Sequence, residues 1–319
     1  MTNADAVPAP SREGGSVHAG WVGAHRPGRR RIRPTTLLMW AWMAIALAGV
    51  VVALAFQASG GRWFIIETPS MGQSAPVGTL VLTEPTTVSD LAVGDLISFH
   101  PPSAPQAVYT HRVVSNDDGQ VSTEGEINGV KDPWTLSDDA LIGKASAVLP
   151  TVGWLIRCLP YLFVGGLLVW IVTRFARTAT RRSSLLILGW SIVASITVFI
   201  VRPFVGVLVL TSKATADGAT ANLVSTGILP IRVQAIGGSH LDLVSGQTGI
   251  ISIPTLAETG TYRMATSLHL DFWGWVVMGA ICALPLLWCI IVGLPPEGPD
   301  EAVRVNRKRS QALALRTAS

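Results

Sequence analysis

Hydrophobic residues gather in long runs at four places along the chain, and the stretches between these runs are polar. Three runs carry no charged residue and approach or exceed the roughly 20 residues that cross a bilayer: Leu37–Phe56, Leu185–Val201 and Phe272–Leu294. A fourth run contains an arginine and a proline near its start, where a cation can reach the interface and a proline costs a helix little. The pattern predicts four transmembrane helices, over residues 37–57, 154–173, 185–201 and 272–294.

The first hydrophobic run has two interpretations. Ala53-Leu54-Ala55 resembles the small-residue site at which a signal peptide is cleaved. The run is longer than the 7–15 apolar residues usual in signal peptides, however, and 36 residues precede it. An uncleaved signal anchor is therefore the better interpretation.

Between the first two runs, residues 58–153 show short alternating segments separated by glycines and prolines. Such punctuation is typical of strands joined by turns. The expected strands are Trp63–Glu67, Thr79–Thr83, Asp95–Phe99, Ala107–Ser115, Gln120–Thr123 and Ala140–Leu149. This pattern predicts a small, mostly β domain held close to the membrane.

Residues 202–271 form a second polar stretch with β-like alternation. Apolar and polar positions alternate around Leu241 and Leu243 and from Tyr262 to Leu268, with turns expected at Gly237-Gly238 and Gly246. His240 and His269 lie here, but no serine–acid arrangement or metal-ligand cluster accompanies them. A structural or interaction role is the better hypothesis for this region.

Basic residues mark the segments expected on the cytoplasmic side. Residues 1–36 hold six arginines and two acids, residues 174–184 hold four arginines and no acid, and residues 295–319 hold five basic residues and three acids. Because such clusters stay in the cytoplasm, both termini are expected there, with residues 58–153 and 202–271 on the opposite side. The protein is thus expected to be a multi-pass protein of the cell membrane, and its net charge of +4 reflects topology rather than binding to nucleic acid.

The composition supports a chain embedded in a lipid bilayer. Hydrophobic residues make up 49% of it and charged residues only 14%, against about 25% charged residues in soluble domains. The three cysteines all lie in or beside predicted spans, so neither a disulfide nor a metal framework is indicated, and no cofactor is expected: Cys158, Cys282 and Cys289. The predicted fold is a mixed membrane protein with four transmembrane α-helices, a small mostly-β domain and a second small β-rich outer region.

Two residues of the first β-like region suggest hydrolytic chemistry. Ser70 follows the first run closely, and His111 lies in a later expected strand. A serine hydroxyl needs a positioned base to attack an amide at neutral pH, and a neutral imidazole can supply one. His100 is a weaker candidate because Pro101-Pro102 follows it and places it in a loop.

An acid beside such a histidine would hold its ring in the productive tautomer. Downstream of His111, the segment Thr123–Pro133 offers Glu124, Glu126 and Asp132. Asp132 is the first choice, but the sequence leaves open whether Glu126 or Asp132 orients the ring.

These pieces, taken in order, resemble the sequence boxes of type I signal peptidases. The resemblance covers roughly residues 62–150, and the histidine is the mark of the branch found in the endoplasmic reticulum, archaea and some Gram-positive bacteria (S26B), where other bacteria have a lysine. The matching pieces are Pro69-Ser70-Met71, Val77-Gly78, Gly94-Asp95-Leu96-Ile97, Thr110-His111-Arg112-Val113-Val114, Gly125-Glu126-Ile127-Asn128, Asp132-Pro133 and Ile142-Gly143-Lys144.

The resemblance implies a catalytic role for each matching position. It makes Ser70 the acylated nucleophile and His111 the general base. Asp132 matches the aspartate that orients the histidine, and Glu126 stands where the family has another aspartate. The oxyanion would be bound by the Ser70 backbone N–H and the Thr68 hydroxyl.

Substrate contacts are also implied. In this family an extended peptide lies beside a strand, and small side chains next to the cut enter shallow apolar pockets. Ile66 and Met71 are the residues expected to form that surface.

The chain departs from the family pattern at three positions. Pro69 replaces a flexible glycine before the nucleophile, Thr79 follows Gly78 where an aspartate is usual, and Glu126 is one methylene longer than the family residue. The proline pushes Thr68 toward an extended conformation but leaves the Ser70 N–H free. Ser74 is not the expected nucleophile, because the methionine of the box follows Ser70.

The leading hypothesis is therefore a membrane-bound serine endopeptidase that removes signal peptides from exported preproteins. One alternative is a non-catalytic assembly or binding protein that retains the peptidase fold. Another is an enzyme for a dedicated surface-protein substrate, such as a fibre or pilus subunit, with residues 202–271 as an exosite.

Overall fold

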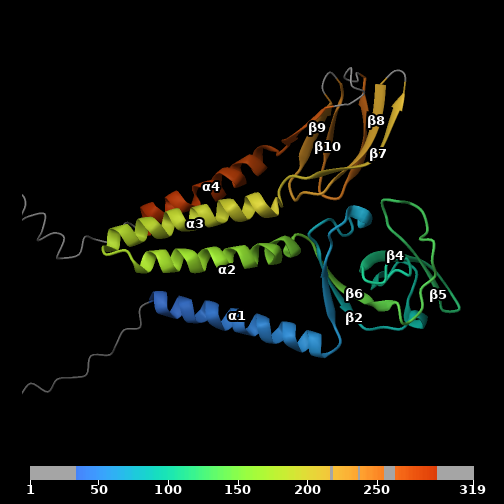
Figure 1. Cartoon of the computed structure of the whole chain (residues 1–319), viewed down its shortest axis with the longest axis horizontal. Helices are drawn as coiled ribbons and strands as arrows, with labels where there is room; N and C mark the ends of the chain where they lie inside the picture. Colours follow the sequence, from blue (N-terminus) through green and yellow to red (C-terminus); the bar gives the residue numbers. More distant parts are fainter. Residues whose placement is uncertain (1–33, 216–217, 236–237, 255–262, 293–319) are drawn as a thin grey trace, which may run out of the picture. The chain divides into compact units, whose positions relative to one another are not determined.

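The computed structural model describes residues 34–215, 218–235, 238–254 and 263–292 (Figure 1). The chain divides into two units, Met1–Leu54 and Ala55–Ser319. Helix α1 (Pro34–Ala58) contains the first hydrophobic run. Its side chains from Trp40 to Ala55 are all exposed, and a helix that is apolar on every side belongs in lipid.

Within the residues that the structure describes, three helices are long and apolar enough to cross a membrane. They are Trp40–Ala58 within α1, Val152–Arg174, which is α2, and Arg181–Val201 within α3 (Ala179–Val201). The last predicted span is helical as α4 (Phe272–Val292). The apolar stretch found within α4, Phe272–Leu284, is too short to cross a bilayer. The fourth crossing therefore stays a prediction.

Helices α2 and α3 lie side by side (Figure 1) and pack through glycines. A Cβ on Gly165 would stand 2.4 Å from Val193 Cγ1, and a Cβ on Gly189 would stand 2.7 Å from Val169 Cγ2. Small residues let membrane helices approach closely, because packing rather than water drives their association. The link between the helices ends at Thr178, whose hydroxyl accepts a hydrogen bond from Arg181 N at 3.3 Å.

The first β region is one antiparallel six-stranded sheet. Its order is β1-β2-β6-β3-β4-β5. All six strands expected from the sequence are present, with ends shifted by a few residues: β1 (Arg62–Ile65), β2 (Leu80–Glu84), β3 (Leu96–Phe99), β4 (Tyr109–Asp117), β5 (Gln120–Glu124) and β6 (Leu141–Leu149).

Two apolar clusters hold this sheet together. Ile97 and Phe99 of β3 pack with Val113 of β4 and Val121 of β5, and none of these side chains is more than 1% exposed. Burial of each such side chain stabilises the fold by about 1.5–3 kcal/mol. A second cluster contains Ile66, Met71, Ala75 and Val81. It underlies the segment that contains Ser70.

The second β region has two three-stranded sheets, confirming its predicted β character. The strand orders are β10-β9-β12 and β11-β8-β7. The strands are β7 (Val207–Thr215), β8 (Gly218–Ser225), β9 (Ile231–Ala235), β10 (His240–Leu243), β11 (Thr248–Ile253) and β12 (Met264–Leu268). Leu223, Ile231 and Val233 are fully buried in their shared core. Gly246 has φ +74°, as the predicted turn requires, whereas Gly237 and Tyr262 lie outside the described residues.

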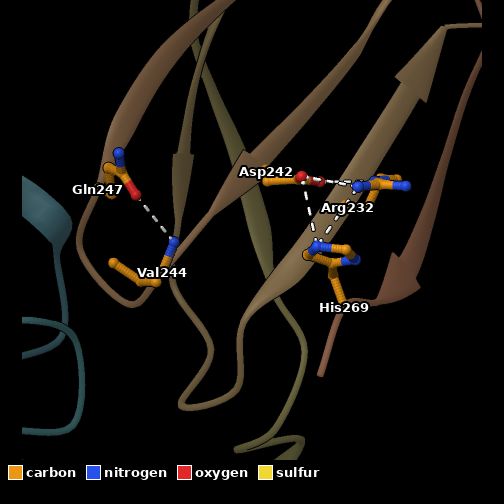
Figure 2. A network of polar contacts seen from close by, with 5 residues as sticks. All are labelled: Arg232, Asp242, Val244, Gln247 and His269. Atoms are coloured by element: carbon orange, nitrogen blue, oxygen red, sulfur yellow. Dashed lines mark hydrogen bonds and ion pairs between the residues drawn. The ribbon is translucent and has the colours of Figure 1, made fainter. Parts of the chain in front are cut away.

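An ion pair joins the strands of this region on their exposed side (Figure 2). Arg232 of β9 pairs with Asp242 of β10 through contacts of 2.6 and 2.8 Å, and His269 Nε2 lies 3.4 Å from Asp242 Oδ2. The hydrogen bond from Arg232 lowers the pKa of Asp242 and outweighs its desolvation. All three side chains are 35–46% exposed, which is typical of cross-strand surface pairing.

Candidate active site

Ser70 lies in a short helical turn, Pro69–Met71, directly after β1. Thr68 is extended (φ −114°, ψ 151°), as the residue before a proline should be. The Gly72 N–H closes the turn on the Pro69 carbonyl at 2.8 Å. The unusual proline therefore occupies the first position of a helical turn, where its fixed φ favours the structure and its missing N–H costs nothing.

Two further contacts hold the segment that contains Ser70. Ile127 N donates to the Ser70 carbonyl at 3.0 Å, and Met71 is fully buried beside Ile66. Met71, which the sequence analysis placed on the substrate surface, has its side chain in the core cluster under the Ser70 turn, and its contact with substrate stays a prediction. Ile66 does line the cleft beside Ser70.

His111 lies on β4, opposite Ile97 of β3, and is 5% exposed. Its Nδ1 is 2.7 Å from Asp132 Oδ2, and the same carboxylate oxygen accepts from Thr123 Oγ1 at 2.6 Å. A backbone hydrogen bond from Asp132 N to the Thr123 carbonyl, at 2.8 Å, ties the acid to β5. Two hydrogen bonds to Thr123 thus hold Asp132 in place, in addition to its contact with the His111 ring.

Aromatic side chains restrict the rotation of the His111 ring. Phe99 and Tyr109 have ring centroids 6.0 and 5.6 Å from the imidazole, and Trp134 packs against both of them. With Nδ1 facing a carboxylate, the assigned tautomer of the neutral ring carries its proton on Nδ1. Nε2 then has a free lone pair and is the atom that can accept a proton.

Ser70 and the free edge of His111 face the same point in space. A Cβ on Gly125 would stand 3.2 Å from His111 Nε2 and 3.4 Å from Ser70 Cβ. In the described part of the chain no hydrogen bond joins the two residues directly, and Ser70 Oγ is 3.5 Å from Thr68 Oγ1. Catalytic hydrogen bonds are often long before substrate binds and tighten in the complex. Because Gly125 has no side chain, the gap between Ser70 and His111 Nε2 stays open.

Glu126 faces Arg112 and not the histidine. Arg112 Nε donates to Glu126 Oε1 at 2.9 Å, its Nη1 to the Gly94 carbonyl at 2.8 Å, and its Nη2 to Ser74 Oγ at 3.2 Å. Neighbouring residues of a strand point to opposite faces, which explains why Arg112 and His111 meet different acids. The choice that the sequence left open therefore falls on Asp132, by proximity to the ring.

Sequence reasoning missed Arg112. It connects three segments around the turn that contains Ser70, and its position directly after His111 was the available signal. Ser74, the other serine of the nucleophile segment, accepts a hydrogen bond from Arg112 and thus has a structural partner.

A second ion pair joins β6 to the residue that precedes β3. Lys144 Nζ lies 2.9 Å from Asp95 Oδ1, and Ala92 N donates to Asp95 Oδ2 at 2.9 Å. Burial would raise the pKa of Asp95, but the hydrogen bonds from Lys144 and Ala92 and the charge of Lys144 outweigh it, so the pKa is lowered. Among the described residues, no group of three or more His, Cys, Asp or Glu side chains gathers as a metal site would.

The site opens into a cleft of about 670 Å³. One wall is Phe64–Thr68 followed by Ser70, and the other is Ala107–His111. Strand β5 pairs with β4 only from Arg112 onward, so β4 presents an unpaired edge ahead of that residue, within the described strands. An extended peptide can add to such an edge through main-chain hydrogen bonds. The cleft therefore has the form of a peptide-binding groove that ends at a serine and a histidine.

Comparison with known families agrees with this geometry. Residues 37–129 match the family model described as signal peptidase, peptidase S26. The matched segment includes Ser70 and His111 and ends before Asp132. No curated protein matches the chain. The match supports a signal peptidase at the level of the family, over less than a third of the sequence.

Proposed function

We propose that this protein is a membrane-bound serine endopeptidase of the histidine-containing type, which removes N-terminal signal peptides from exported proteins. The observation that carries the proposal is the meeting of Ser70 and His111 Nε2 at Gly125, at the end of a peptide-sized cleft. Asp132 lies behind the ring at 2.7 Å. The family match over residues 37–129 supports the substrate class.

In the acylation step, Ser70 Oγ attacks the carbonyl carbon of the scissile peptide bond. His111 Nε2 takes the hydroxyl proton as the new bond forms, and the Asp132 carboxylate stabilises the resulting imidazolium. The imidazolium then gives this proton to the leaving amine, and the mature protein departs. The signal peptide remains as an ester on Ser70 until water, deprotonated by the same histidine, hydrolyses it.

The negative charge on the attacked carbonyl oxygen needs donors in place beforehand. The Ser70 backbone N–H and the Thr68 hydroxyl are the proposed pair, because both adjoin Ser70 Oγ and the hydroxyl lies 3.5 Å from it. One such donor typically stabilises the transition state by about 3–4 kcal/mol. The proline turn keeps both donors on the same short segment.

The proposed topology follows from the charged segments and the helices. In this topology both termini lie in the cytoplasm. The domain of residues 58–153, which contains the cleft, and residues 202–271 lie on the opposite side of the membrane. This arrangement presents the cleft to a substrate that enters from the membrane. It requires α4 to complete the fourth crossing.

The test is cleavage of a preprotein with an Ala-x-Ala site by the detergent-purified full chain. Ser70→Ala and His111→Ala are expected to lose cleavage, whereas the matched control Ser74→Ala, in the same segment, is expected to keep most of it. Equal and negligible cleavage by the wild type and all variants over several preproteins would contradict the proposal. A non-catalytic assembly protein would then be the better account.

A further inference from the structure

Helix α2 follows β6, a strand of the sheet that contains the site, almost directly along the chain. Strand β6 ends at Leu149 and α2 begins at Val152. Thr151, in the two-residue joint, adopts φ +66°, a left-handed conformation that a threonine rarely takes. So short a connection leaves little freedom between the helix and the sheet.

The first turn of α2 packs on the turn before β2. Trp154 is 8% exposed, and its Nε1 donates to the Val77 carbonyl at 2.9 Å. A Cβ on Gly78 would stand 1.9 Å from that nitrogen, and a Cβ on Gly153 would stand 2.6 Å from the Gly78 carbonyl oxygen. Gly78 also has φ +85°, so the indole and the backbone both require glycine there.

The next turn of α2 reaches the wall of the cleft. Arg157 forms an ion pair with Glu67, which lines the cleft, and its guanidinium lies 5.5 Å from the centroid of the Trp154 ring. The Gly78 N–H donates to the Ile66 carbonyl at 2.8 Å. Helix α2 thus contacts Glu67 directly, and it packs on Gly78, which is hydrogen-bonded to Ile66. Both residues lie a few positions before Ser70.

We propose that the first two turns of α2, through Trp154 and Arg157, fix the height and tilt of the cleft relative to the membrane. Trp154 is then a positioning residue that decides which bond of a membrane-embedded signal peptide reaches Ser70. The inference rests on the proposed function. An extended peptide advances about 3.3 Å per residue, so a cleft displaced by that distance meets a neighbouring bond.

The test compares two substrates of the full-length protein. One is a preprotein whose signal peptide lies in the bilayer of the liposomes that hold the enzyme. The other is a short soluble peptide that covers only the cleavage site, assayed in detergent. Only the first substrate has its position set by the membrane, so only it senses the height of the cleft.

Trp154→Ala is expected to lower cleavage of the bilayer-held preprotein at the normal bond by roughly 10- to 100-fold, as small misplacements do. Mass spectrometry of the products should show cuts one or two residues away. Cleavage of the soluble peptide should stay within about twofold. Trp154→Phe keeps most of the packing and removes only the N–H, so a smaller change in the same direction is expected.

Trp170→Ala is the matched control. Trp170 is 54% exposed at the other end of α2, where Arg174 lies 5.4 Å from its ring centroid, and this variant should cleave both substrates like the wild type. Equal loss on both substrates, or an unchanged rate and site with the preprotein, would overturn the positioning role of Trp154. A wild type that cleaves neither substrate would refute the proposed function itself.

Discussion

Replacement of Asp132 by asparagine removes the charge behind the proposed base and keeps the side-chain shape. In the native site Asp132 Oδ2 accepts from both His111 Nδ1 and Thr123 Oγ1, at 2.7 and 2.6 Å. Asparagine can still accept through its oxygen, so the fold should survive. What is lost is the stabilisation of the imidazolium that forms when Ser70 gives up its proton.

The size of this loss follows from burial. The side chains of His111 and Asp132 are only 6% and 9% exposed, so solvent screens their attraction weakly. Two unit charges near 4 Å apart attract by about 4 kcal/mol at an effective dielectric constant of 20. Since about 1.4 kcal/mol corresponds to a tenfold change in rate, Asp132→Asn should lower kcat roughly 10³-fold.

The assay is single-turnover cleavage of a preprotein, with thermal unfolding of each variant as a check on folding. Asp117→Asn, an exposed carboxylate at the end of β4, is the matched control and should retain wild-type rates. A kcat for Asp132→Asn within about threefold of the wild type, at unchanged stability, would refute the electrostatic role assigned to Asp132.

Three further substitutions test the geometry and the charges of the first β domain. Gly125→Ala places a methyl group 3.2 Å from His111 Nε2, so we expect cleavage to fall by roughly 10²-fold with little change in unfolding temperature. Gly119→Ala, at φ +84° with nothing within 4 Å, should instead lose stability and keep its kcat, and the reverse pattern would contradict this view of the gap. Asp95→Asn tests the Lys144 pair: because the pKa of Asp95 is lowered on folding, its contribution is present above the ordinary aspartate pKa and is lost as pH falls through the folded pKa. The variant should be less stable than the wild type near pH 7, by no more than about 1 kcal/mol because the Lys144 side chain is 45% exposed. The difference in denaturant midpoint should disappear in acid, and a constant difference would contradict the assignment.

The strands of the first β domain could be predicted because each carries a local signal. In β5, for example, Val121 and Thr123 are buried and alternate with more exposed neighbours, so the period of two is written in the sequence. The ends of the strands were less predictable. They depend on partner strands, as with β1, where pairing to β2 stops at Ile65.

The sequence favoured Asp132 as the acid beside His111 but could not exclude Glu126. Glu126 and Asp132 are both within reach along the chain, and only the register of β4 with β5 and the turn after Glu124 decides which one meets the ring. The burial of Met71 was hidden for a related reason. A methionine after Ser70 suits a substrate surface or a core equally well, and its burial depends partly on Val81 of β2, which lies on another element of the fold.

Contacts between the second hydrophobic helix and the sheet were also invisible in the sequence. In the sequence, Trp154 is only the first residue of the predicted span 154–173, and Gly78 is part of the piece Val77-Gly78. Their contact joins positions 77 and 154, and no periodic pattern encodes such a long-range pair. Resemblance located the serine and histidine, whereas the support around them required three-dimensional structure.

The most direct test of the account is chemical detection of the ester on Ser70. Wild-type protein would be mixed with excess preprotein, quenched in acid within one turnover, digested and analysed by mass spectrometry. We expect the mass of the signal peptide on the fragment that contains Ser70, and none on Ser70→Ala. Cleavage accompanied by an adduct on Ser74, or cleavage that persists in Ser70→Ala, would contradict the assignment of Ser70 as the nucleophile.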